Sequence, residues 1–118
     1  MSIVIAGEVD LPPENRDAAL SGARALIAGA LAETGCRHYA WTADPHDPGR
    51  LHVFEEWASE ADLAAHFRGD PYRGMLAHLG QHTILKAETR KYRVDCTEPV
   101  YGPDGVPSAR FLTAGVDA

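Results

Sequence analysis

The segment from Gly35 to Leu79 constrains the fold most, because it holds two strand patterns joined by a turn and then two helix patterns. The turn, Asp44-Pro45-His46-Asp47-Pro48-Gly49, is made of residues that favour turns and do not continue a strand. We therefore predict an antiparallel hairpin with strands at 36–43 and 50–57. Two-residue alternation places one set of side chains of the second strand on a single face: Leu51, Val53, Glu55 and Trp57.

Two short helices are predicted after the hairpin. Ser59 and Asp62 have the spacing of a capping box, with aspartate in place of the usual Glu or Gln. This first helix presents Leu63, His66 and Phe67 on one face. Asp70-Pro71 is typical of an N-cap followed by the first helical residue. The second helix is expected to end at Gly80, and its apolar stripe consists of Tyr72, Met75, Leu76 and Leu79.

Regular patterns also flank this segment. The β-branched run from Ile3 to Asp10 is typical of a strand, and Pro12-Pro13 opens a stretch of helical spacing that continues to Glu33. Residues 81–94 have the pattern of a last, long strand. The order β-α-β-β-α(α)-β predicts an α+β fold over residues 1–94, with a four-stranded antiparallel sheet and helices on one face.

The second face of such a sheet would be bare. The chain has more apolar residues in and near its strands than one helical layer can cover, namely Ile3, Val4, Ile5, Phe54, Trp57, Ile84 and Leu85. An uncovered apolar face favours burial against a partner, and a second copy of the same chain is the simplest one. We therefore predict a homodimer.

Residues 95–118 differ from the rest in composition. They contain Pro99, Pro103 and Pro107 together with several glycines, and they show no periodicity. This predicts either a mobile tail or an extended arm that packs on its own or the partner subunit. Partial ordering is favoured by the apolar side chains Tyr101, Val106, Phe111 and Leu112.

Charge and composition argue against several classes of partner. The net charge of −6 disfavours nucleic acid, because phosphate binding needs clustered Lys and Arg. The sequence has no basic amphipathic segment that would bind a membrane surface, and it has no apolar run of about 20 residues that would span a bilayer. The first ten residues lack the features of a signal peptide, so we expect a cytoplasmic protein. Cys36 and Cys96 are accordingly expected to be reduced thiols.

Six histidines raise the question of a metal site. His78 and His82 are four residues apart, but Gly80 lies between them at the expected helix end. We therefore predict that they do not share a helical face. A structural zinc site also needs more ligands than this pair offers, so no metal is expected.

His66 is the strongest candidate for chemistry. It follows Leu63 by three residues, so its ring should lie near the boundary between helix and sheet. One role is structural, with the ring bonded to a backbone carbonyl or to water. The other is that of a proton acceptor facing a cavity, since histidine titrates in the range where that work is done.

Aromatic residues of the hairpin and the following helix leave the same two roles open. Trp57 and Trp41 either pack in the core or wall a pocket in which a flat substrate stacks. Tyr39 and Tyr72 could each donate a hydrogen bond to a phenol or a carbonyl. His38 either lines the same cavity or only packs against its neighbours.

Glu55 shares a strand face with apolar residues, and a carboxylate is costly to bury without a partner. The default expectation is a structural ion pair. The cations that could neutralise Glu55 are Arg37, Arg73 and Lys86.

Over about residues 2–94 the chain resembles the antibiotic biosynthesis monooxygenase family. The resemblance rests on the order and spacing of five short motifs: Gly35-Cys36, Tyr39, the Asp44–Gly49 turn, Glu55-x-Trp57 and Leu63-Ala64-Ala65-His66-Phe67. It implies a ferredoxin-like fold and a homodimer in which two sheets form an α+β barrel, with an apolar pocket in each protomer. Several members of this family oxidise polyketide anthrones or quinols with O2 and without metal or flavin, whereas others degrade haem.

The resemblance therefore implies a cofactor-independent monooxygenase acting on a small aromatic substrate and O2. In that reading His66 is the base and Tyr72 the hydrogen-bond donor. Substrate contacts are expected from Trp57, Phe67, Glu55, His38, Tyr39 and Trp41.

Other functions remain open at this stage. The same pocket could bind a ligand without turnover, as a regulatory dimer, or could serve an isomerase or cyclase. An imidazole in an open cleft would favour catalysis, whereas a pocket filled by Trp57, Phe67 and Met75 would favour binding alone. The haem-degrading branch resembles the chain less, because its first-strand asparagine is missing and the only asparagine is Asn15.

Overall fold

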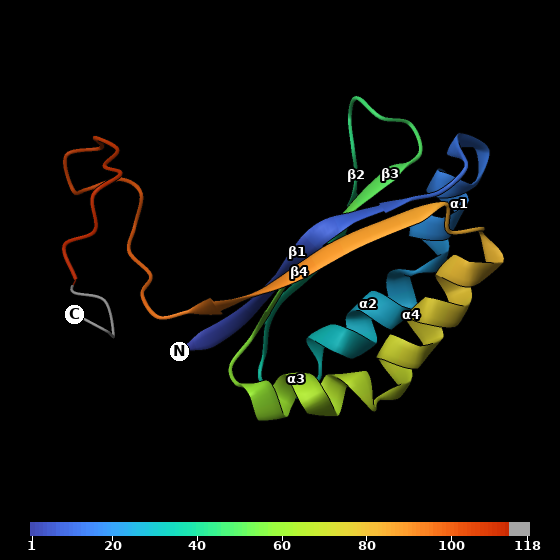
Figure 1. The fold of residues 1–118 in the computed structure, drawn as a ribbon, viewed down its shortest axis with the longest axis horizontal. Coiled ribbons are helices and arrows are strands. Elements are labelled where there is room, and N and C mark those ends of the chain that lie inside the picture. The colour runs from blue at the N-terminus through green and yellow to red at the C-terminus, as the bar shows by residue number, and fades with distance from the viewer. Residues whose placement is uncertain (114–118) are drawn as a thin grey trace.

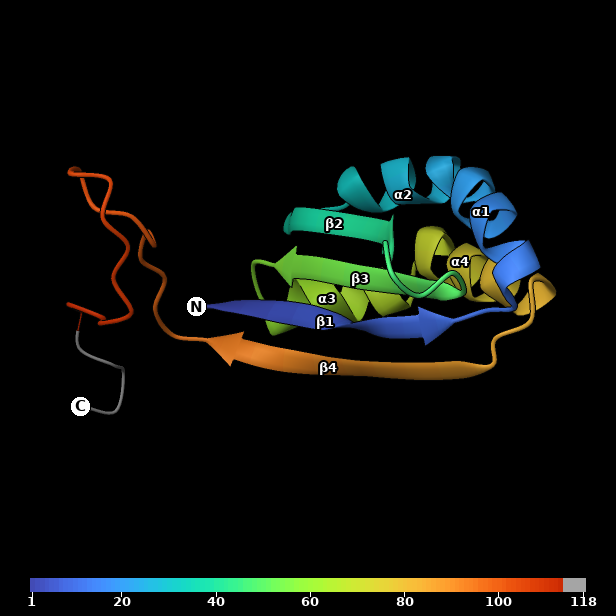
Figure 2. The same cartoon turned by 90° about the horizontal axis from the view of Figure 1, so that it is seen from above.

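The computed structural model describes residues 1–113 of the chain. Four strands form one antiparallel sheet in the order β2-β3-β1-β4, and all the helices cover the same face of it (Figures 1 and 2). This confirms the predicted α+β class and the four-stranded antiparallel sheet. The elements are β1 (Ser2–Asp10), α1 (Pro13–Gly22), α2 (Arg24–Leu31), β2 (Cys36–Ala43), β3 (Arg50–Trp57), α3 (Glu60–Phe67), α4 (Asp70–Gln81) and β4 (Lys86–Val94).

The predicted hairpin is confirmed, with β2 and β3 at the expected residues. The cap of α3 is confirmed as well, because the Ser59 side chain accepts the backbone N–H of Asp62 at 3.1 Å. At α4 the prediction was off by one residue. Gly69 is the N-cap and Asp70 is the first helical residue, without a side-chain cap bond.

The single helix predicted over residues 12–33 is wrong, because the structure has two helices that meet at Ala23. The backbone N–H of Ala23 bonds to the carbonyl of Leu20, which tightens the chain locally. Gly22 lies here against α4, and a Cβ at this position would come within 2.7 Å of the His78 ring. The glycine thus permits a close approach between helices.

The predicted end of α4 at Gly80 is also wrong, as is the start of the last strand. The helix continues to Gln81 and the strand begins only at Lys86. Because the helix passes through Gly80, the rings of His78 and His82 lie 5.0 Å apart, contrary to the prediction that they would not share a face. No third histidine, cysteine or carboxylate joins this pair within residues 1–113.

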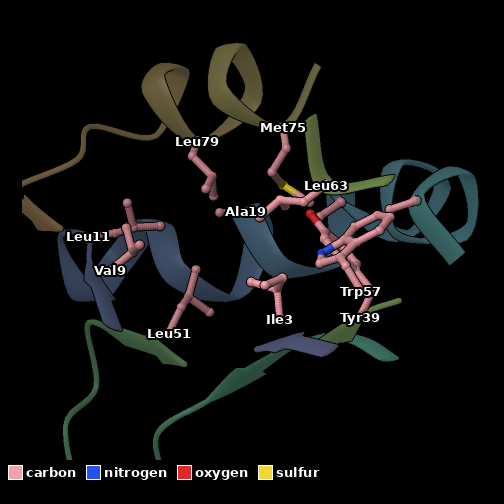
Figure 3. Close-up of a cluster of buried hydrophobic side chains, with 12 residues drawn as sticks. Ile3, Val9, Leu11, Ala19, Tyr39, Leu51, Trp57, Leu63, Met75 and Leu79 are labelled. Carbon is pink, nitrogen blue, oxygen red and sulfur yellow. The ribbon is translucent and has the colours of Figure 1, made fainter. Parts of the chain in front are cut away.

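The core lies between the sheet and the helices (Figure 3). The predicted alternation along β3 is confirmed, since Leu51, Val53, Glu55 and Trp57 are all buried. On β1, Ile3 and Val9 point to the same side and are also buried. The core residues that Figure 3 labels are Ile3, Val9, Leu11, Ala19, Tyr39, Leu51, Trp57, Leu63, Met75 and Leu79.

The other face of the sheet carries no helix (Figure 2). Phe54 and Tyr92 lie there with 45% and 49% of their surface exposed, and Val4 is opposite Tyr92 in the strand register. Ile3 and Trp57, which contributed to the expectation of a bare apolar face, lie on the covered face instead. The homodimer stays a prediction that rests on the remaining residues of the open face.

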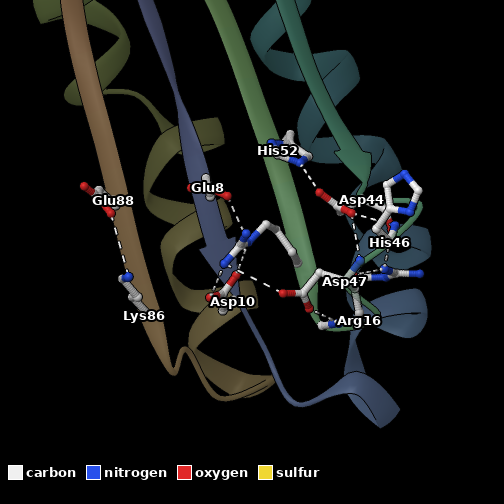
Figure 4. A network of polar contacts seen from close by, with 11 residues as sticks. Glu8, Asp10, Arg16, Asp44, His46, Asp47, His52, Lys86 and Glu88 are labelled. Atoms are coloured by element: carbon white, nitrogen blue, oxygen red, sulfur yellow. Dashed lines mark hydrogen bonds and ion pairs between the residues drawn. The ribbon is translucent and has the colours of Figure 1, made fainter.

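The hairpin turn is tied to the sheet by ion pairs and hydrogen bonds (Figure 4). Arg50 Nε lies 2.9 Å from Glu8 Oε2 and 2.9 Å from Asp10 Oδ1, which connects β3 to β1. Asp44 Oδ2 lies 2.6 Å from His52 Nε2. This bond and the backbone N–H groups of the turn hold the pKa of Asp44 well below its usual range. The turn is thereby held in one conformation at the end of the sheet away from α3.

After Val94 the chain leaves the sheet and runs beyond its end, away from the helices (Figures 1 and 2). It is partly ordered through an isolated bridge between Tyr101 and Pro107. In addition, the Glu98 carboxylate accepts the backbone N–H of Leu112 at 3.0 Å and that of Thr113 at 2.7 Å. The apolar side chains of this segment are exposed. The predicted tail also includes residues 114–118, which lie outside the described residues.

Leu51→Ala should destabilise the domain by about 2–5 kcal/mol, because the side chain is 1% exposed and its removal leaves a cavity in the core. Urea denaturation followed by circular dichroism measures the free energy of unfolding. Leu85→Ala is the matched control, since Leu85 is 63% exposed and its truncation should change stability by no more than about 0.5 kcal/mol. Equal losses for the two variants would contradict the placement of the core.

Candidate functional site

A cavity of about 260 Å³ lies between the helix-covered face of the sheet and α4. Its wall is mostly apolar, with contributions from β1, β3, β4 and both helices that follow the hairpin. Its ionisable side chains are Glu55, Tyr39 and Tyr72. An apolar cavity with a few convergent polar groups is the usual form of a small-molecule site.

Among residues 1–113, Glu55 is the only carboxylate that lines this cavity, and the residue is only 7% exposed. Trp57 Nε1 donates a hydrogen bond to Glu55 Oε1 at 3.0 Å, and His66 Nε2 lies 3.9 Å from the same oxygen. Burial raises the pKa of Glu55 above its ordinary value, although the indole N–H and His66 oppose this shift. Nearby Glu33 adds to the rise because its negative charge disfavours a second one.

The cations expected to neutralise Glu55 do not reach it, so that prediction was wrong. Each of them is engaged elsewhere: Arg37 with Glu56 at 3.4 Å, Arg73 with Asp70 at 2.6 Å and Lys86 with Glu88 at 3.8 Å. The physical reason is that strand alternation turns Glu55 inward, beneath α3 and α4, while these cations extend into solvent. An indole N–H and an imidazole take the place of an ion pair.

His66 lies behind Glu55 rather than in the cavity wall. Its side chain is 1% exposed, and its Nδ1 lies 2.6 Å from Glu33 Oε1. Because a carboxylate only accepts hydrogen bonds, Nδ1 carries the hydrogen, which leaves Nε2 facing Glu55. The imidazole is stacked 4.4 Å from the Trp57 ring and has the Tyr72 ring edge-on at 5.6 Å. Its orientation is therefore fixed on every side.

Glu33 was not predicted from the sequence. It follows α2 (Arg24–Leu31) in the chain and is separated from His66 by 33 residues. A glutamate near a helix end has the pattern of a solvated surface residue, so nothing local marks it. Its other carboxylate oxygen lies near Gly69, where a Cβ would come within 2.7 Å of it. The chain thus brings Glu33 and His66 together only through the packing of α2 beside α3 and α4.

The tyrosines stand at the same end of the cavity. Tyr39 is opposite Glu55 in the register of β2 and β3, and its hydroxyl accepts a hydrogen bond from Trp41 Nε1 at 3.1 Å. Burial is the main cause that raises the pKa of Tyr39 to about 12. This phenol therefore keeps its proton at neutral pH and can donate it in a hydrogen bond. Tyr72, from α4, also lines the cavity.

The structure brings most of the predicted site residues together. Tyr39, Trp41, Glu55, Phe67 and Tyr72 line the cavity. Trp57 does not, because its indole is fully buried within the core cluster (Figure 3), from where Nε1 donates a hydrogen bond to Glu55. His38 lies on the open face of the sheet beside Phe54, 3.8 Å from Glu56, and does not reach the cavity.

Glu55→Gln should raise thermal stability at pH 8, because glutamine keeps an oxygen for the Trp57 N–H and removes the buried charge. Above its raised folded-state pKa the carboxylate is ionised at a cost to folding, and below the ordinary value of 4.5 it is protonated in both states. The gain should therefore shrink as the pH falls from 8 toward 4.5. Differential scanning calorimetry measures it.

The control is Glu56→Gln, since Glu56 is on the opposite strand face and has cation partners. It should show no such gain. A Glu55→Gln variant that is less stable than the wild type at pH 8 would contradict the inferred burial cost.

Comparison with known proteins gives a consistent family. The sequence profile described as "Antibiotic biosynthesis monooxygenase" matches residues 2–77, more than half of the chain. An uncharacterised protein of Synechocystis, sll1783, is 26% identical over 97 residues. That match covers 81% of this chain and 65% of the relative, so the chain spans just under two thirds of that protein's length.

Solved structures agree with this assignment. A conserved protein of Methanosarcina mazei has a TM-score of 0.72 at 26% identity, covering 79% of this chain and 92% of its own. A structure named antibiotic biosynthesis monooxygenase has a TM-score of 0.67 at 26% identity, covering 83% and 100%. A Deinococcus radiodurans protein reaches 0.76 at 15% identity, covering 85% and 99%, which shows the fold alone. No helix within residues 1–113 has the length and apolar character that a membrane span requires. From the profile match and the shared fold, the chain belongs to the antibiotic biosynthesis monooxygenase family.

Proposed function

We propose that this protein is a cofactor-independent monooxygenase that oxidises an aromatic, polyketide-like quinol or anthrone with O2. Family membership supports the reaction class, and one structural observation supports the proposed site. That observation is a buried carboxylate, Glu55, facing an apolar cavity with two phenols beside it. The proposal includes a second copy of the chain that covers the open face of the sheet.

The chemistry explains why such a site suffices. Triplet O2 reacts slowly with closed-shell organic molecules, so the substrate itself must become a good electron donor. Removing a proton from an anthrone or a phenol does this. The protein then has to supply a base, a dry pocket and hydrogen-bond donors for the oxyanion that develops.

Glu55 is the group placed to accept the proton, because its carboxylate is in the cavity wall. Its raised pKa makes it a stronger base than an ordinary glutamate. His66 supports it from behind and can share the accepted proton, and Glu33 balances the charge of the imidazolium that would form. We propose that Glu55 and His66 act together as the base and that Glu33 orients His66, as a carboxylate orients the histidine of a hydrolase triad.

The other side chains of the cavity bind and orient the substrate. Tyr39 keeps its proton at neutral pH, and Tyr39 and Tyr72 are the donors that face the developing oxyanion. Phe67 and Trp41 form flat walls, and the aliphatic residues behind them exclude water. The cavity is not filled by Trp57, Phe67 and Met75, which supports turnover over ligand binding alone.

The reaction balances without a further reagent. Glu55 takes a proton from the reactive CH2 group, the carbanion passes one electron to O2, and the radical pair combines to a peroxide that takes the proton back. Loss of the second proton from the same carbon breaks the O–O bond and releases hydroxide, which leaves as water after protonation. The CH2 group becomes C=O, and one O2 is consumed for each water formed.

Glu55→Gln should lower kcat for anthrone oxidation by about 10²–10⁴-fold, because the amide fills the same space but accepts no proton. Oxygen consumption at pH 7.5 measures the rate. In the wild type, activity should fall as the pH drops through the raised pKa of Glu55, at a higher pH than an ordinary carboxyl would give. A variant within about twofold of the wild-type rate would exclude Glu55 as the base.

Glu33→Gln and His66→Ala should each reduce kcat by about 10²-fold or more while leaving the cavity open. To separate a chemical role from a structural one, the tautomer of His66 is read by ¹⁵N NMR. The wild type should show the Nδ1–H form imposed by Glu33, and Glu33→Gln should show a mixture of tautomers. Unimpaired oxidation by His66→Ala would remove the imidazole from the mechanism.

A further inference from the structure

A second hollow, of about 340 Å³, adjoins the cavity and shares Phe67 with it. Its floor is apolar and is formed by Ile3, Leu63 and Phe67. Two basic side chains from β4, Lys91 and Arg93, complete its wall. The hollow therefore joins an apolar surface to a local positive charge in a chain whose net charge is −6.

The strand register shows why the two spaces are continuous. Successive residues on one face of a strand are about 7 Å apart, and Ala87, Thr89, Lys91 and Arg93 all face the helices. The first two line the cavity and the last two line the adjoining hollow. On β1 the neighbours follow the same order, since Ile5 lines the cavity and Ile3 the hollow. A single elongated ligand can lie along both.

The basic groups are available to such a ligand. Neither Lys91 nor Arg93 has an ion-pair partner among residues 1–113, whereas Lys86 on the same strand is paired with Glu88. One carboxylate, that of Glu60 in the first turn of α3, is also in the wall of the hollow. The hollow thus contains two positive groups and one negative group.

We propose that Lys91 and Arg93 form a subsite for an anionic substituent of the substrate, so that the substrate class is an aromatic ring system bearing a carboxylate. The ring lies in the cavity next to Glu55, and the carboxylate extends past Phe67 to β4. This proposal rests on the proposed function for the identity of the ring. The distance from Thr89 to the basic residues, one to two strand repeats, sets the reach of the substituent at about 7–13 Å.

Binding of two unreactive ligands tests the subsite without turnover. The probes are anthraquinone-2-carboxylate and its neutral carboxamide, followed by quenching of tryptophan fluorescence, since Trp41 lines the cavity. The wild type should prefer the carboxylate by about tenfold, which corresponds to two partly exposed charge pairs of ordinary strength. In the Lys91→Met, Arg93→Met double variant the preference should fall to about one, with the carboxamide affinity unchanged.

Lys86→Met is the matched control, because it removes a charge from the other face of β4 and should leave the preference intact. Equal binding of both ligands by the wild type, a preference that survives in the double variant, or no binding of either ligand would overturn the subsite. Oxygen consumption separates this proposal from the proposed function. If neutral anthrones are oxidised and the carboxylate is not preferred, the proposed function stands and the subsite is rejected. If the carboxylate is preferred but no anthrone is oxidised, the subsite stands and the proposed function is rejected.

Discussion

The burial of the Glu55 carboxylate is the constraint on which the rest of the site depends. Strand alternation turns this side chain under the helices, and no Lys or Arg side chain in the described part of the chain pairs with it. A buried charge needs hydrogen-bond donors directed at it, and Trp57 Nε1 supplies one at 3.0 Å, while His66 Nε2 lies 3.9 Å from the same oxygen. His66 in turn is hydrogen-bonded to Glu33, so the two carboxylates and the imidazole connect β3, α3 and the residues that follow α2.

The burial of Glu55 suits its proposed role as a base, at some cost to the stability of the fold. An apolar residue at position 55 would fit the core without requiring an indole N–H or an imidazole to face it. The raised pKa of Glu55 is the direct sign that the fold does not fully compensate the charge. A carboxylate that the fold holds at a cost is what a base in a dry cavity requires, because full compensation would also reduce its basicity.

Local patterns in the sequence predicted the hairpin, the cap at Ser59 and the sheet face that carries Glu55, since each follows from turn chemistry or strand alternation. The break at Ala23 and the extension of α4 through Gly80 could not be read locally. The break lies where Gly22 meets His78 of α4, a contact between helices that no local pattern shows. The same limit applies to the site. Tyr39 and Trp41 share a strand pair with Glu55, but Glu33 reaches His66 only through tertiary structure.

The sheet and the helices contribute different parts of the site. The sheet supplies the Glu55 carboxylate and part of the cavity wall, through the register of β2 and β3. The helices supply Glu33, His66 and Tyr72, whose effect depends on how α2, α3 and α4 pack. Membership in the family therefore accounts for the fold, whereas the proposed reaction depends on which side chains the helices direct toward the cavity. In this chain His66 lies 3.9 Å from Glu55 and is hydrogen-bonded to Glu33, which is why we propose that the proton chemistry takes place at that end of the cavity.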